Sequence, residues 1–125
     1  MKPRDATLRL KRFEANEKAR KVASLETMIL DFDHMAADLT RQIAAEEERT
    51  GIKDASHFAY STFAKAAALR RANLLTSVAD LRAKLDIARQ EHEDALTELR
   101  RIEPVDTRDG DRQLRAGQGS SAVIG

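Results

Sequence analysis

The sequence predicts an all-α fold, namely an antiparallel two-helix coiled coil (a helical hairpin) followed by a disordered C-terminal tail. Two long stretches carry apolar residues at alternating steps of three and four, and a helix breaker separates them. Charged residues make up 34% and aromatic residues only 4% of the 125 residues, a composition typical of long helices rather than of a thick globular core. We therefore expect one domain, with the hairpin at 1–103 and the tail at 104–125.

The first helix is expected at about 5–49, with Asp5 as its N-cap. Its apolar stripe, which we call the seam, is Val22, Leu25, Ile29, Phe32, Ala36, Leu39 and Ile43. Before Val22 the pattern is irregular, because Lys11 and Lys18 occupy seam positions. Such a start is typical either of a splayed end that binds a partner or of a frayed end.

The connector is expected at about 50–60 and the second helix at about 61–103. Gly51 can end the first helix in the left-handed conformation, and Pro104 stops the second helix. Asp54, Ser56 and Ser61 are each possible N-caps of the second helix. Its seam is Leu74, Val78, Leu81, Leu85, Ala88, Ala95, Leu99 and Ile102. After Pro104 the apolar period is lost and Gly, Ser and charged residues dominate, which predicts disorder.

Charge favours an antiparallel arrangement, because each helix begins basic and ends acidic. Folding back at the connector then places each basic end beside an acidic one, whereas a parallel dimer would place like charges together. We therefore expect a monomer when the chain is free. The predicted register pairs Ile29 with Leu81, Phe32 with Val78, Ala36 with Leu74 and Val22 with Ala88.

No motif predicts catalysis, a cofactor or a metal ion. The chain has no Cys, and His34 with Asp38 at i, i+4 is interpreted as a solvated pair rather than a metal site. The formal net charge of +1 gives no drive toward nucleic acid. No apolar run reaches the roughly 20 residues of a membrane span, so we expect no direct membrane insertion and a soluble cytoplasmic protein. Because no cleft or constellation of catalytic residues is indicated, we expect that it is not an enzyme.

Three aromatic residues, Phe58, Tyr60 and Phe63, gather where the hairpin should close. They can plug the open end of the seam, or they can form an apolar contact patch for a partner. The two interpretations are compatible.

Taken together, several segments resemble the flagellar export protein FliJ family in its alphaproteobacterial form. The segments are the opening 4–13 (RDATLRLKRF), the central Gly51-Ile52 followed by 57–60 (HFAY), and the entry 63–67 (FAKAA) into the second helix. The resemblance spans about 2–103, and the central segment is its most diagnostic part. A Gly/Ser-rich tail after Pro104 departs from the family, in which this helix often continues with charged sequence.

This resemblance implies an antiparallel coiled coil similar to the stalk subunit of rotary ATPases. It implies a non-enzymatic, cofactor-free component of the flagellar type III export apparatus, cytoplasmic and peripheral to the inner-membrane basal body. The implied partners are the hexameric export ATPase, whose activity it would regulate, the export gate protein FlhA and export chaperones.

Analogy with the rotary stalk assigns the two ends of the hairpin to different partners. The end formed by the helix termini would meet the ATPase, through Leu10, Lys11, Arg12, Phe13, Leu99 and Ile102. The closed end would meet the gate or chaperones, through Phe58, Tyr60 and Phe63. The alternative is a generic structural coiled-coil adaptor or chaperone unrelated to export.

Overall fold

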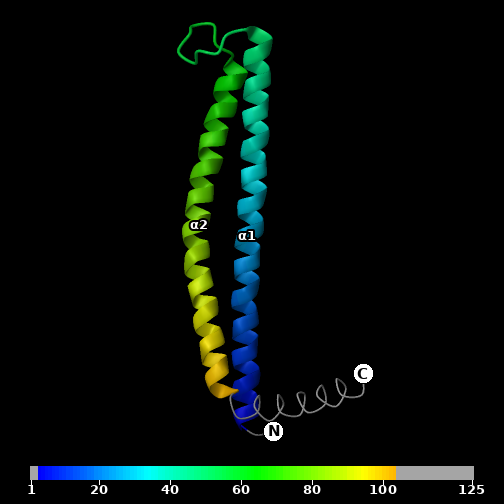
Figure 1. The fold of residues 1–125 in the computed structure, drawn as a ribbon, viewed down its shortest axis with the longest axis vertical. Helices are drawn as coiled ribbons and strands as arrows, with labels where there is room; N and C mark the ends of the chain where they lie inside the picture. The colour runs from blue at the N-terminus through cyan, green and yellow to red at the C-terminus, as the bar shows by residue number, and fades with distance from the viewer. Residues whose placement is uncertain (1–2, 104–125) are drawn as a thin grey trace, which may run out of the picture. The chain divides into compact units, whose positions relative to one another are not determined.

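Two long helices that pack against each other make up the fold, which confirms the predicted all-α class (Figure 1). The computed structural model describes residues 3–103, with α1 at Pro3–Thr50 and α2 at Thr62–Ile102. No strand occurs within these described residues. The tail predicted at 104–125 lies outside them.

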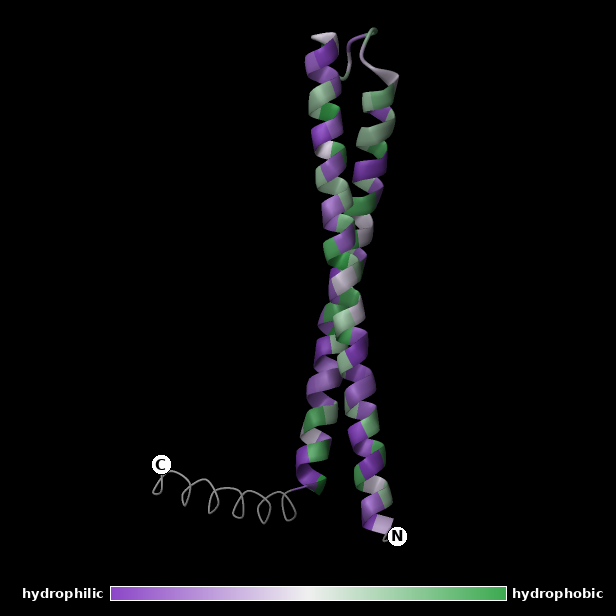
Figure 2. Cartoon of the chain, turned by 90° about the vertical axis from the view of Figure 1, so that its right-hand side faces the viewer, coloured by the Kyte–Doolittle hydropathy of each residue, from purple (hydrophilic) through white to green (hydrophobic). Residues whose placement is uncertain are grey.

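The chain divides into two compact units. We call residues 3–20 with 89–103 the terminal unit, and residues 21–88 the connector unit. Each unit contains a segment of α1 lying beside a segment of α2. Figure 2 shows hydrophobic and hydrophilic residues alternating in short patches along both helices, as expected for helices with one apolar stripe.

The connector unit holds two groups of buried side chains. In one, Leu39 and Ile43 of α1 pack with Tyr60, Ala64 and Ala67. In the other, Leu25 of α1 packs with Leu81, Leu85 and Ala88, and Val22, Ile29 and Phe32 cover that group. The partners agree with the predicted register, which sets Val22 near Ala88 and Ile29 near Leu81.

The start of α1 differs from the prediction. The helix begins at Pro3, so Asp5 lies within the first turn and is not the N-cap. Proline suits a first helical position because its fixed φ is helical and the amide hydrogen it lacks would be unsatisfied there in any case. Asp5 still contributes, since a carboxylate in the first turn interacts favourably with the helix dipole.

Successive polar contacts confirm the antiparallel orientation in each unit, because a later residue of α1 meets an earlier residue of the second half of the hairpin. The contacts are Arg12 with Glu103 and then Lys18 with Glu91, and Asp33 with Arg82 and then Thr40 with Arg71. In the terminal unit, Lys18 Nζ lies 2.9 Å from Glu91 Oε2. In the connector unit, Arg82 lies 3.1 Å from Asp33. Exposed pairs of this kind are worth only about 0.2–1 kcal/mol each, so they select the orientation while the seam supplies the stability. Within the described residues, neither helix has a stretch long and apolar enough to cross a membrane.

Candidate functional site

The first candidate surface is the start of α1, where the apolar residues lie on different faces of the helix. Leu8 and Ala15 are buried, whereas Leu10 and Phe13 are 55% and 60% exposed. Since Leu8, Lys11, Ala15 and Lys18 continue the seam spacing back from Val22, Leu10 and Phe13 fall outside it. The terminal unit therefore carries an exposed apolar pair at i, i+3.

Charged residues surround this pair. Lys11 is half-buried in the seam and lies 3.5 Å from Glu14, one turn away on the same helix. Arg12 is exposed and its Nε lies 2.9 Å from Glu103 Oε1. This contact joins the start of α1 to the residue that follows α2. The predicted cations are therefore partly neutralised within the unit.

Leu99 and Ile102 lie on the seam side of α2 and are half-buried. Of the six residues predicted for the ATPase end, the structure leaves Leu10 and Phe13 as the exposed apolar side chains. Leu99 and Ile102 instead help to hold the two helices together.

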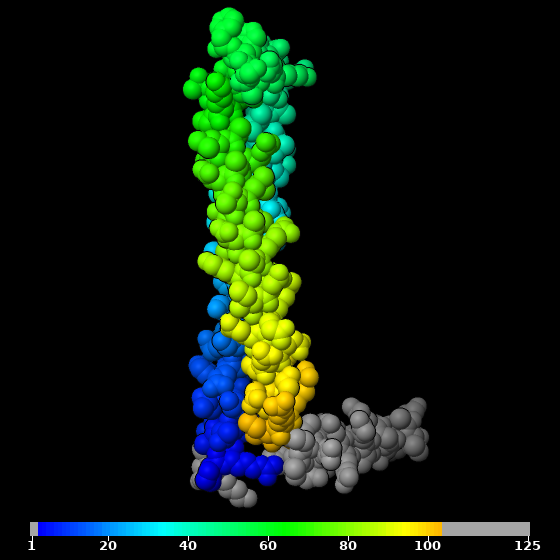
Figure 3. All heavy atoms as spheres, turned by 90° about the vertical axis from the view of Figure 1, so that its left-hand side faces the viewer, coloured from blue at the N-terminus to red at the C-terminus, as the bar shows by residue number. Residues whose placement is uncertain are grey.

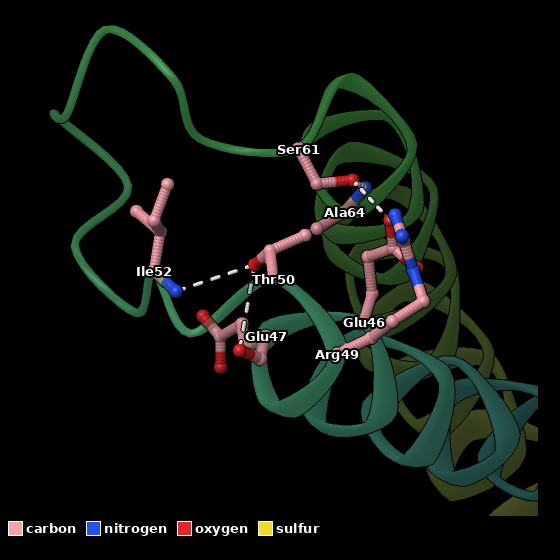
Figure 4. A network of polar contacts seen from close by, with 7 residues as sticks. All are labelled: Glu46, Glu47, Arg49, Thr50, Ile52, Ser61 and Ala64. Carbon is pink, nitrogen blue, oxygen red and sulfur yellow. Dashed lines mark hydrogen bonds and ion pairs between the residues drawn. The ribbon is translucent and has the colours of Figure 1, made fainter.

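The second candidate surface is the connector, and its first residue fixes the end of α1. Gly51 has a φ of +74°, in the left-handed region, and its N–H donates to Glu47 O at 2.8 Å. This is the simple left-handed helix cap, which glycine adopts without the steric cost of a Cβ. The next amide, of Ile52, donates to the Thr50 hydroxyl at 3.2 Å (Figure 4).

Among the three possible N-caps of α2, the structure selects Ser61. Its Oγ accepts a hydrogen bond from Ala64 N at 3.1 Å and its hydroxyl donates to Glu46 Oε1 at 2.9 Å (Figure 4). Arg49 also donates to the Glu46 carboxylate, and the pKa of Glu46 is lowered chiefly by Arg49 and then by Ser61. Glu46 thereby links the end of α1 to the start of α2.

Tyr60 is buried and belongs to the core rather than to an exposed contact patch. Its hydroxyl donates to Glu47 Oε2 at 2.8 Å. This hydrogen bond, with a smaller effect of burial, raises the pKa of the phenol. Of the two roles predicted for the aromatic residues, Tyr60 therefore has the structural one, since it closes the open end of the seam rather than forming an exposed contact patch.

Phe58 takes the opposite role, because 96% of its surface is exposed. Its ring stacks on His57 with the centroids 4.7 Å apart. The backbone below is ordered by Asp54, whose carboxylate accepts hydrogen bonds from Ser56 N and Oγ, and by His57 Nδ1, which accepts from Ala59 N at 3.0 Å. The connector thus presents Phe58 on a defined turn, and Figure 3 shows the connector residues (green) as surface atoms at that end of the unit.

Phe63, the third predicted aromatic, is more than half exposed on the first turn of α2. The three aromatic residues therefore do not form one patch. Sequence reasoning missed Glu46 and Glu47, which anchor Ser61 and Tyr60. No local pattern marks these carboxylates, because their partners lie 15 and 13 residues further along the chain.

Within residues 3–103, no three His, Asp or Glu side chains converge as metal ligands would. Asp38, the predicted neighbour of His34, forms an ion pair with Arg41. Comparisons with known protein families, with characterised proteins and with solved structures found no match to this chain.

Proposed function

We propose that this chain is a FliJ-like component of the flagellar type III export apparatus, which acts as a coiled-coil stalk on the export ATPase. One observation supports it most: the exposed pair Leu10 and Phe13 lies in the terminal unit, where the stalk analogy requires a contact surface. Large apolar side chains at the centre of a contact contribute most of its binding energy. Leu10 and Phe13 lie three residues apart on α1, so their side chains are neighbours on the helix surface and can act as one contact.

The composition of the terminal seam also supports a contact role. Lysines at positions 11 and 18 reduce the apolar area buried between the helices, and Lys11 directly follows Leu10 in the chain. A hexameric ATPase that presents acidic and apolar side chains would complement this surface. In this proposal the chain acts as a cytoplasmic monomer, peripheral to the inner-membrane basal body.

Phe58 is the corresponding candidate for the other partners. A fully exposed aromatic ring held on an ordered turn is suited to insert into a pocket of the export gate protein FlhA or of an export chaperone. Phe63 would extend this contact. Tyr60 would support it from within the core.

The experiment that tests the stalk role is steady-state ATP hydrolysis by the cognate export ATPase, with and without this protein. The native chain should stimulate hydrolysis, and Leu10→Ala/Phe13→Ala should require at least about tenfold more protein for the same stimulation. Leu30→Ala/Phe63→Ala is the matched control. It also truncates one exposed leucine and one exposed phenylalanine, which are 56% and 55% exposed, but these lie in the connector unit. This control should behave like the native chain.

A second control separates loss of contact from loss of fold. Val22→Asp/Leu85→Asp places carboxylates in the seam and should abolish both helix pairing and stimulation. No stimulation by the native chain, together with no co-purification with the ATPase, would favour the generic coiled-coil adaptor. Equal effects of the two alanine pairs would refute the assignment of Leu10 and Phe13.

A further inference from the structure

The two edges of the connector unit differ in their polar contacts. On one edge, which we call the paired edge, side chains of α1 form ion pairs or hydrogen bonds with side chains of α2 or of the connector. Besides Asp33 with Arg82, Thr40 accepts a hydrogen bond from Arg71 at 3.2 Å, and Glu47 accepts one from Tyr60. This edge is closed by the chain's own polar groups.

The other edge, which we call the open edge, consists of residues seven apart that directly precede Val22, Ile29, Ala36 and Ile43 on α1 and Ala64, Arg71, Val78 and Leu85 on α2. Residues seven apart lie on the same side of a coiled-coil helix. The open edge comprises Lys21, Met28, Met35 and Gln42 on α1 and Phe63, Arg70, Ser77 and Lys84 on α2. Within the described residues, no hydrogen bond or ion pair joins these side chains across the two helices.

Where such contacts are absent, the surface along the open edge has hollows. Two of about 160 Å³ each share Leu39, Gln42 and Arg70 in their walls, so they are neighbours. Met35 lines one of them and Phe63 lines the other. A third, of about 370 Å³, lies between Lys21 and Lys84. The exposed apolar side chains Met35, Phe63 and Ile87 border the hollows, and the buried residues Leu39 and Leu25 form part of their walls.

The charges lining the hollows are mostly of one sign. Lys21, Arg70 and Lys84 contribute three cations, none of which forms an ion pair within residues 3–103. The only carboxylate among the lining residues is Asp38, which pairs with Arg41. A ligand for this edge must therefore be apolar at its centre and acidic at its flanks.

We propose that the open edge is a docking groove for an amphipathic helix of a partner protein, with an apolar stripe flanked by Asp and Glu. A groove between two helices fits a third helix, and flexible Met side chains adapt to the apolar residues it presents. A second copy of this chain fits less well, since a symmetric contact through this edge would bring the same cations together. The inference does not depend on the role in flagellar export.

The test uses the full-length chain and a synthetic helical peptide with Leu at its a and d positions and Glu at the flanking positions. Titration is followed by backbone amide shifts and by fluorescence anisotropy of the labelled peptide. Shifts should concentrate at Met28, Met35, Arg70 and Lys84, and the affinity should fall with added salt. The same peptide with Lys in place of Glu should not bind.

Charge-reversal variants locate the contact. Arg70→Glu/Lys84→Glu should weaken binding about tenfold, since each pair changes from attraction to repulsion. Lys65→Glu is the matched control for Lys84→Glu, because Lys65 is an exposed lysine of α2 that does not line the hollows, and it should bind like the native chain. Circular dichroism should show equal helix content in all variants.

Four results would overturn the proposal. They are no binding of the acidic peptide, equal binding of the basic peptide, shifts concentrated at Asp33 and Arg82 on the paired edge, and equal losses for Lys84→Glu and Lys65→Glu. Sedimentation that shows a dimer lost on Arg70→Glu/Lys84→Glu would assign the groove to a second copy and would also refute it.

Discussion

Two identical substitutions on α2 test whether the seam carries the stability. Leu85 is 6% exposed and packs with Leu25, Leu81 and Ala88, whereas Leu69 is 65% exposed on the same helix. Leu85→Ala removes buried methyl and methylene groups at about 0.8 kcal/mol each and leaves a cavity, while Leu69→Ala removes atoms that are mostly in water. Helix propensity changes equally in both, so it cancels.

We expect Leu85→Ala to lower the free energy of unfolding by about 2–3 kcal/mol. This is the lower part of the usual range, because solvent on both sides of a two-helix seam lets the site collapse. Leu69→Ala should change it by less than about 0.7 kcal/mol. The assay is urea unfolding followed by helical circular dichroism, with the slope compared between variants to detect changes in the unfolded state. If both variants lost the same free energy of unfolding, Leu69 would be buried in solution, against a second copy or in another register. That result would refute the assignment of Leu85 to the seam and of Leu69 to the surface.

Four further outcomes follow from the helix ends, the single tyrosine and the two units. Gly51→Ala should destabilise by about 1 kcal/mol in the same urea assay, since no atom crowds a Cβ there and the cost is purely the left-handed backbone. Ser61→Ala should cost about 1 kcal/mol through the lost N-cap. The Tyr60 pKa should be above 10.0 in an absorbance titration of the folded chain and should fall with Glu47→Gln. Because the pKa is higher in the folded state than in the unfolded state, the stability that this shift contributes is present below about pH 10 and is lost as the pH rises through the folded pKa. Amide hydrogen exchange should be faster in the terminal unit, where the seam contains lysines, than in the connector unit.

The fold was largely predictable because the apolar spacing of a coiled coil is repeated many times along the sequence. Each seam residue from Val22 to Ile43 predicts the same face, so one ambiguous position does not alter the result. The end of a helix, by contrast, is indicated by only a few local cap residues. Asp5 was wrong as an N-cap because Pro3 is an equally good start, and nothing else in the sequence decides between them.

The candidate site was less predictable, because burial in the connector depends on tertiary partners. Phe58 and Tyr60 are two residues apart and chemically similar, yet one is exposed and the other is buried. Tyr60 packs with Leu39, Ile43, Ala64 and Ala67 of the two helices and Glu47 accepts from its hydroxyl, whereas Phe58 lies on a turn outside that cluster. Ser61 was likewise one of three candidates until Glu46 distinguished it.

Departures from the heptad pattern, rather than the pattern itself, carry the information about function in such a chain. A lysine at a seam position weakens helix pairing, and the charge of Lys18 is compensated by Glu91 on the other helix. Leu10 and Phe13 add apolar surface where the seam gains nothing from it. Arg70 and Lys84 line hollows without forming an ion pair within residues 3–103. None of these choices improves a two-helix fold on its own. Each becomes favourable when a second protein supplies the missing apolar surface or negative charge, so these positions are where partners should be sought first.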